Sequence, residues 1–506
     1  MSSTTHPGAS AGYPGPRGPH GAAAGGADLG IQNNPLGTMP VPRLLLKYAP
    51  PAILSMMVTA LYNLIDTFFV GHAVGQNGIA ATTVALPLMM IMGAFGMWFG
   101  AGGNARAAIK MGEGDYPEAE RTMGNVLFML IVVPLTLAIV MVIFLDPVLN
   151  FLGATDTNRQ LSRDFCHVIL WGFPLMAIGG GLSNFIRTDG APTYALVVMF
   201  LGALLSGILN WVLVMLLGMG MTGSALATVG GQLLSAVLVV QYFLGKRSRL
   251  KLRLRNLRPS IKLIGSIAVM GLSTFAVQVA ASLTVSILNI QISTLGPTDP
   301  IGADGGLAVI GTVQKVTQLL FFIMLGFSIA AQPIFGFNWG AHQYGRVRHA
   351  LWITIAAATI TNLILWIPCC IFSDQIMGFF GLTSDLHDFA ARSFIFMTAM
   401  YLVVPLQIVG SNFFMATGQP LKATFLTMTR QLIFYLPFLF IIPRVIPLFF
   451  PGLTELAALP LAPSFADACA IIVTVIFMIR EMRRIRGLEQ ARGAVAASDA
   501  AACKVA

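Results

Sequence analysis

Long apolar stretches separated by short polar connections dominate the chain from about residue 44 to residue 485. Two of them, 125–145 and 194–217, contain no Asp, Glu, Lys or Arg, and about 20 such residues suffice for a helix to cross the hydrocarbon core of a bilayer. Backbone polar groups in lipid must be satisfied internally, so repeated stretches of this length predict a bundle of transmembrane helices. We predict twelve spans, at residues 44–71, 78–110, 119–145, 161–187, 192–217, 223–245, 260–294, 304–338, 347–373, 386–416, 420–443 and 464–485.

Composition supports a membrane protein and argues against a soluble one. The 506 residues are 56% hydrophobic and only 10% charged, whereas soluble domains carry about 25% charged residues. The net charge of +10 does not predict nucleic-acid binding, because the basic residues lie in short connections and tails, with no separate basic domain. The five cysteines show no metal or redox spacing, and we interpret them as packing or incidental residues.

The distribution of Lys and Arg predicts the orientation of the spans. If both termini are cytoplasmic, 24 of the 30 Lys and Arg residues fall on the inner side and only four on the outer side. Such a bias is typical of cytoplasmic loops. We therefore predict a multi-pass protein of a bacterial inner membrane with both termini in the cytoplasm. The basic residues between 246 and 262 are interpreted first as a topology determinant and linker, and second as a surface attracted to lipid headgroups.

An internal repeat organises the chain. Residues of the second half match those of the first half at a constant spacing of 228 positions. Because six spans separate the matched residues, both halves have the same orientation, which predicts a pseudo-two-fold axis along the membrane normal. The matches include Gly112 with Gly340, Tyr116 with Tyr344, Gly190 with Gly418, Pro192 with Pro420, and the run 183–185 with 411–413.

The repeat defines the predicted fold class and domains. We expect an all-α polytopic membrane protein with about 12 transmembrane helices in two pseudo-symmetric six-helix bundles. The expected segments are a disordered cytoplasmic tail at 1–40, a first bundle at 41–245, a basic linker at 246–258, a second bundle at 259–486 and a disordered tail at 487–506. Two such halves around a central cavity suit alternating access.

Polar residues inside the spans mark candidate functional sites. Such residues are costly in a bilayer unless they meet a partner or line a cavity. In the first span Tyr62, Asn63 and Asp66 lie on one helical face. In the second half we predict cavity-lining candidates, together with Tyr62, at Gln278, Ser282, Asn289, Gln314, Lys315, Gln318, Gln407, Arg430 and Gln431. For the hydroxyl and amide residues, helix packing is an equally ordinary role.

Asp66 is predicted to be the only carboxylate deep inside a span. Other acidic residues fall in connections or at span edges. Because an apolar environment disfavours the charged form of a carboxylate, such a residue can exchange a proton as a cavity alternates between the two sides. The alternative is an Asp66 that only clamps two helices through a hydrogen bond to Asn210.

Several motifs resemble multidrug and toxic compound extrusion (MATE) transporters. They are the run Leu64–Gly71, the loop Gly112–Asp115, Arg187–Gly190, Gly223–Thr228 and Gln332–Ala341. The resemblance covers roughly residues 45–480, and within the family the chain is most similar to the DinF/MepA-type branch. It implies twelve helices in two bundles and export of cationic or amphipathic drugs against an inward flow of protons or sodium.

The resemblance also implies an ion-coupling cluster of Asp66, Asn210 and Thr228, to which we add Asn63. The carboxylate usual four residues after the fifth-helix asparagine is Val214 here, and Gln278 replaces a glutamate found in the NorM-type branch. A lone acid favours H+ over Na+ as the coupling ion.

Three classes of function remain open from the sequence. The first is a drug antiporter with no cofactor or metal, membrane lipids and drug-like cations as its partners, and no oligomer required. The second is a flippase for lipid-linked precursors of the same superfamily. The third, an intramembrane enzyme or receptor, is disfavoured because the chain lacks the motifs of a zinc protease, a serine hydrolase or a P-loop.

Overall fold

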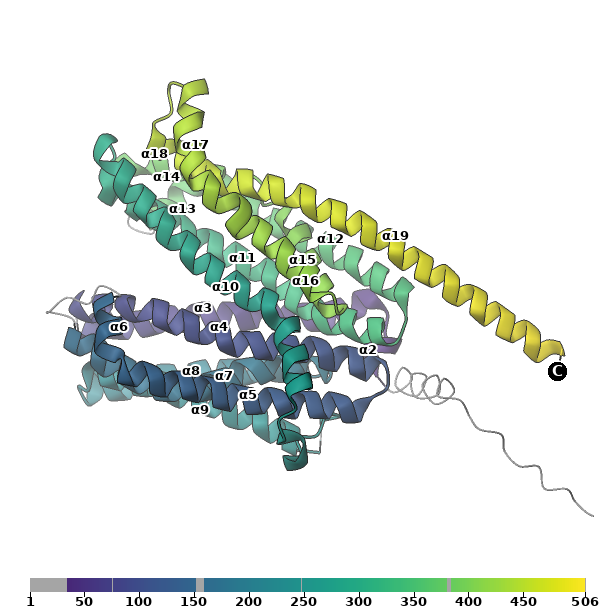
Figure 1. The fold of residues 1–506 in the computed structure, drawn as a ribbon. Coiled ribbons are helices and arrows are strands. Elements are labelled where there is room, and N and C mark those ends of the chain that lie inside the picture. The colour runs from purple at the N-terminus through teal and green to yellow at the C-terminus, as the bar shows by residue number, and fades with distance from the viewer. Residues whose placement is uncertain (1–33, 75, 152–158, 247, 380–383, 506) are drawn as a thin grey trace, which may run out of the picture.

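The computed structural model describes residues 34–74, 76–151, 159–246, 248–379 and 384–505. For some of these residues, including Asn63, it describes the backbone but not the surroundings of the side chain. Within the described ranges the regular elements are all helices. They form two groups, which we call the N-lobe (α3 to α9) and the C-lobe (α10 to α19) (Figure 1).

The N-lobe contains the first six long helical segments. The fifth segment changes from α-helix to a π-helical turn, η1, directly after Asn210. The elements are α3 (Val41–Val74), α4 (Gln76–Gly112), α5 (Tyr116–Ile143), the short α6 (Leu145–Phe151), α7 (Arg159–Thr188), α8 (Pro192–Asn210) with η1 (Trp211–Leu216), and α9 (Gly220–Leu244).

The C-lobe repeats this order. Its fifth segment also contains a π-helical stretch, η4, between two α-helices. The elements are α10 (Ile261–Leu295), α11 (Gly302–Gly340), α12 (Tyr344–Ile371), the short α13 (Ser373–Phe379), α14 (Ser384–Thr398) and α15 (Val404–Ala416), α16 (Pro420–Met428) with η4 (Thr429–Tyr435) and α17 (Leu436–Phe449), the short α18 (Glu455–Ala458), and α19 (Ala462–Val505). Short turns η2 (Leu254–Leu257), η3 (Gly296–Thr298) and η5 (Leu459–Leu461) complete it, and α2 (Pro35–Thr38) precedes the N-lobe.

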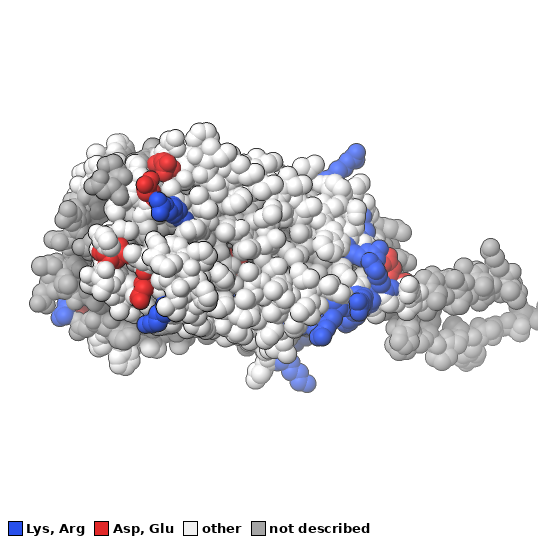
Figure 2. Space-filling model, turned by 90° about the horizontal axis from the view of Figure 1, so that it is seen from above, with Lys and Arg blue, Asp and Glu red and all other residues white. Residues whose placement is uncertain are grey.

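The predicted twelve-span, all-α membrane fold is confirmed. Among the described residues, ten segments are long and apolar enough to cross a bilayer. The second and tenth predicted spans correspond to α4 and to the pair α14–α15. Figure 2 shows the charge distribution expected of a membrane-spanning protein. Charged side chains gather towards the two ends of the molecule, and the middle of this face has hardly any.

The two lobes meet around the axis that relates the repeats. Asn104 and Gln332, which occupy equivalent positions 228 residues apart, share a hydrogen bond of 3.3 Å. A Cβ on Gly340 would lie 1.9 Å from the carbonyl oxygen of Ile109, and a Cβ on Gly112 would lie 2.0 Å from that of Phe337. Only glycine permits the helix backbones to approach this closely. We call this junction, where α4 and α11 end, the closed end; towards the opposite end the lobes diverge in Figure 1.

The two predicted tails compare differently with the structure. Most of the segment 1–40 lies outside the described residues, but its last part contains α2. Residues 487–505, which we expected to be disordered, continue α19 as helix to Val505. The Ala-rich composition of this stretch explains the difference, because alanine has the highest helix propensity.

Candidate functional site

Asp66 lies at a meeting point of three N-lobe helices. Its Oδ1 accepts a hydrogen bond of 2.7 Å from the Ser224 hydroxyl on α9 and one of 3.4 Å from the Asn210 amide at the end of α8. Thr228, one helical turn beyond Ser224, lies beside both Asp66 and Tyr62. All the hydrogen-bond partners that the structure shows for this carboxylate are neutral.

The cluster around Asp66 has spare hydrogen-bonding capacity. Among the side chains that the structure describes, none forms a hydrogen bond with the buried hydroxyls of Tyr62 and Ser206 or with the buried Oδ1 of Asn210. Unpaired buried polar atoms are costly, and they concentrate where a proton, a water or a ligand binds. The adjoining π-helical turn η1 supports this interpretation, because such turns often occur at functional sites.

The structure brings together most of the predicted coupling cluster. Asp66, Asn210 and Thr228 lie side by side, whereas the side chain of Asn63 is outside the described residues. Sequence reasoning missed Ser224, which makes the shortest hydrogen bond to Asp66. The signal was present, since Ser224 belongs to the Gly223–Thr228 motif and precedes Thr228 by one turn. The role of the cluster in ion coupling stays a prediction.

The prediction that Asp66 is the only carboxylate deep in a span is wrong. Asp467 on α19 is 2% exposed and pairs with Arg430, which is 18% exposed, through an Nε–Oδ1 contact of 2.6 Å. Arg430 was predicted as a cavity residue, and its guanidinium also lies 6.0 Å from the ring of Phe321. The error has a physical cause: Asp467 falls near the start of its predicted span, and its burial depends on an arginine from another helix.

The other second-half candidates occupy varied environments. Gln407 is buried, and neither its amide nitrogen nor its amide oxygen has a hydrogen-bond partner within the described part of the chain. Lys315, Gln318 and Asn289 are exposed, and the remaining four, Gln278, Ser282, Gln314 and Gln431, are partly buried. Among the described residues no hydrogen bond links these candidates into one cluster, so their assignment to substrate binding stays a prediction.

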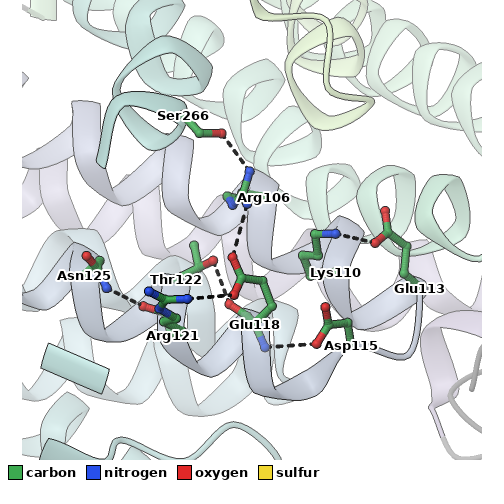
Figure 3. A network of polar contacts seen from close by, with 9 residues as sticks. All are labelled: Arg106, Lys110, Glu113, Asp115, Glu118, Arg121, Thr122, Asn125 and Ser266. Carbon is green, nitrogen blue, oxygen red and sulfur yellow. Dashed lines mark hydrogen bonds and ion pairs between the residues drawn. The ribbon is translucent and has the colours of Figure 1, made fainter. Parts of the chain in front are cut away.

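A second polar network lies at the closed end (Figure 3). Arg106 on α4 donates to Ser266 of the C-lobe at 2.7 Å and pairs with Glu118 at 3.3 Å, and Lys110 pairs with Glu113 at 2.6 Å. Arg106 and Lys110 line an open groove of about 490 Å³ between the lobes. Arg106 thus joins the two lobes where their helix ends meet.

The fold and the site together define a class of protein. Two pseudo-symmetric bundles of membrane helices, a junction at one end and a polar cluster inside one bundle are the parts of a membrane transporter built from parallel repeats.

The chain belongs to the MATE family. A family model described as MatE matches residues 51–212 and 275–441, which is one match in each half of the repeat. This result confirms the resemblance inferred from the motifs, and it makes the chain a transporter and not an enzyme.

Relatives and solved structures agree with this assignment. The multidrug export protein MepA of Staphylococcus aureus (strain MSSA476) is 21% identical over 445 residues, which cover 87% of this chain and 95% of MepA. MepA of Staphylococcus haemolyticus is 20% identical over 402 residues, covering 79% and 86% of the two chains. The structure of the MATE multidrug transporter DinF-BH, solved as a complex, has 31% identity and a TM-score of 0.79, covering 88% of this chain and 96% of DinF-BH. The outward-facing structure of a multidrug resistance MATE transporter has 21% identity and a TM-score of 0.81, covering 91% and 98%.

Proposed function

We propose that this protein is a secondary multidrug antiporter that exports cationic or amphipathic compounds in exchange for inward H+. The Asp66 cluster carries the proposal: a carboxylate inside the N-lobe, bonded by Ser224 and Asn210, with no cation among its described hydrogen-bond partners. The names of the relatives support the substrate class, since MepA is a multidrug export protein and DinF-BH is a MATE multidrug transporter. The protein would work as a monomer in a bacterial inner membrane, with both termini cytoplasmic.

The mechanism follows from competition at one carboxylate. When the lobes are open to the outside, a proton binds Asp66 and removes its negative charge, so a cationic drug loses its attraction to the cluster and leaves. The protonated protein then opens inward, where the proton dissociates and a new drug binds. A coupled exchange of this kind needs the drug and the proton to favour different states of the same group.

H+ suits this cluster better than Na+. The second carboxylate that the family resemblance leads us to expect four residues after Asn210 is replaced by Val214, which is buried in η1. Apart from the Asp66 carboxylate, Na+ would depend on neutral oxygens such as those of Tyr62 and Ser206 for its coordination. One carboxylate is sufficient for a proton.

Gradient-driven transport in proteoliposomes tests the proposal. We expect efflux of a cationic dye to be driven by an imposed proton gradient, to be insensitive to a sodium gradient, and to be lost in Asp66→Asn. Asp146→Asn is the matched control, because Asp146 is an exposed acid that pairs with Arg163 and not with a residue of the cluster. Dye efflux driven by sodium alone would overturn the choice of ion. Translocation of lipid-linked saccharides without any dye transport would favour the flippase.

A further inference from the structure

Residues 34–40 form a short strap that leads into the N-lobe. Asn34 caps α2 by accepting a hydrogen bond of 3.1 Å from the backbone amide of Leu36, whose side chain is fully buried. The next helix, α3, begins at Val41, and the amide of Leu44 bonds the carbonyl of Pro40. The strap is therefore continuous with the first helix of the N-lobe.

Two C-lobe residues hold the strap by its backbone. The Arg346 guanidinium donates to the carbonyl oxygens of Leu36 at 3.1 Å and of Met39 at 2.7 Å. Asn338 donates to the same Leu36 oxygen at 3.0 Å, and its own oxygen accepts from Nε of Arg346 at 2.9 Å. A planar guanidinium with several donors is suited to holding such a set of oxygens in one geometry.

The chain leaves little slack between this anchor and the N-lobe. Only Pro40 separates Met39 from α3, and successive Cα atoms lie about 3.8 Å apart. Separating the lobes at the closed end therefore requires that the bonds to Leu36 and Met39 break, or that the start of α3 stays with the C-lobe. The acceptors are neutral carbonyl oxygens, which water can replace when the strap leaves.

We propose that Arg346 is a positioning residue of the transport cycle, which stabilises the arrangement closed at this end by tying the strap to the C-lobe. The proposal rests on the alternating access of the proposed function. The hydrogen bonds that the structure describes for Arg346 go to Asn338, Leu36 and Met39, and none of them reaches the Asp66 cluster. Arg346 shifts the equilibrium between the arrangement that is closed at this end and the one that is open at this end, and in this way it affects transport.

The test is a distance measurement across the closed end by paired spin labels in a cysteine-free background. Gln241 on α9 and His349 on α12 are exposed positions, one on each lobe. In Arg346→Gln we expect the ratio of the long-distance to the short-distance population to rise about tenfold, because hydrogen bonds from a charged donor contribute more than neutral ones. Arg346→Lys keeps the positive charge but loses the planar guanidinium with its several donors, so it should shift the ratio in the same direction by a smaller factor.

Arg348→Gln is the matched control. Arg348 lies on the same helix two residues on and pairs with Glu489 of the C-lobe at 3.3 Å, so its loss should leave the ratio unchanged. Equal ratios in Arg346→Gln and Arg348→Gln would overturn the proposal and would indicate that the start of α3 moves with the C-lobe. A failure of both Arg346 variants to fold would also overturn it, because the residue would then be structural. If the wild-type ratio responds to neither pH nor dye, alternating access itself fails, whatever Arg346 does.

Discussion

Asp66 and Asp467 both lie inside apolar spans, and their partners differ in charge. Asp66 accepts hydrogen bonds from Ser224 and Asn210, which are neutral, whereas Asp467 pairs with the cation of Arg430. A neighbouring positive charge favours the ionised form of a carboxylate, and neutral surroundings of low polarity do not. This difference in partners is consistent with the proposed proton exchange at Asp66, and it predicts a structural ion pair at Asp467.

Replacing Asp467 by Asn should destabilise the protein by about 3–5 kcal/mol, because it leaves a buried arginine without its counter-charge. The loss should appear as a lower unfolding temperature of the purified protein in detergent. Asp467→Asn combined with Arg430→Gln should recover most of the stability, since no charge then remains uncompensated. A stable single variant that has lost transport would contradict the structural assignment and would place Asp467 in the coupling mechanism.

At the residue scale the sequence was informative only in part. The grouping of Asp66 with Asn210 and Thr228 came from motif resemblance, and the structure places them together. The Arg430–Asp467 pair joins residues 37 positions apart on different helices, and periodicity within one helix says nothing about such a contact. A buried ion pair is therefore the kind of feature that a single sequence hides.

The linker between the lobes is fixed to the N-lobe by three buried side chains. Asp189, just after α7, accepts hydrogen bonds from the amides of Arg249 at 3.0 Å and Leu250 at 2.9 Å. Glu120 accepts from the amide of Lys251 at 2.9 Å, and Asn125 bonds the linker at Asn256 and Ser260. This segment should move with the N-lobe.

Asp189→Asn should loosen the linker. Both carboxylate oxygens of Asp189 accept from the amide of Arg249, so an NH2 group in place of either oxygen would face that N–H donor. Weakening such bonds by about 1.5 kcal/mol would raise the open population roughly tenfold. Trypsin should then cut after Arg249 and Lys251 about ten times faster, as followed by mass spectrometry, while cutting after the exposed Arg483 stays unchanged. Asp388→Asn, at an exposed acid, is the control. Unchanged cleavage in Asp189→Asn would mean that the carboxylate does not hold the linker.

The helices themselves were predictable, because length and hydropathy are local properties. The predicted span at 119–145 corresponds to α5, and the one at 347–373 to α12. The tenth predicted span, 386–416, is interrupted in the structure by turns between α14 and α15. Val404 and Pro405 begin α15, and a proline cannot supply the backbone N–H that a continuous helix requires.

At the scale of the whole molecule, the repeat predicted the symmetry of the two lobes but not which end of the molecule is closed. The spacing of 228 residues implies an axis, and the Asn104–Gln332 hydrogen bond lies on it. Which end of the molecule is closed depends on how the two lobes pack, and both arrangements preserve the same sequence pattern. The closed end is known only from contacts such as those of Gly112 and Gly340.

Gly340→Ala should weaken closure at this end, because the added Cβ would lie 1.9 Å from the carbonyl oxygen of Ile109. Overpacking of this kind costs about 1–3 kcal/mol, so the distance between labels on the two lobes should shift towards the longer population by about fivefold or more. In Gly265→Ala nothing lies within 4 Å of the new Cβ, and the distances should not change. An unchanged distribution in Gly340→Ala would show that the close backbone approach is not needed for closure.

If drug and proton compete for Asp66, drug binding must release a proton, and measuring that release tests the competition most directly. Purified protein in weakly buffered detergent solution receives a saturating cationic dye at a pH low enough that dye affinity still rises with pH, so that Asp66 starts protonated, while a pH indicator records released protons. We predict about one proton released per dye bound by the wild type, because binding and proton loss are linked through the same carboxylate. Asp66→Asn should release no protons, whereas Asp146→Asn should release as many per bound dye as the wild type. Equal release from Asp66→Asn and the wild type, or dye binding by the wild type without any release, would contradict the account.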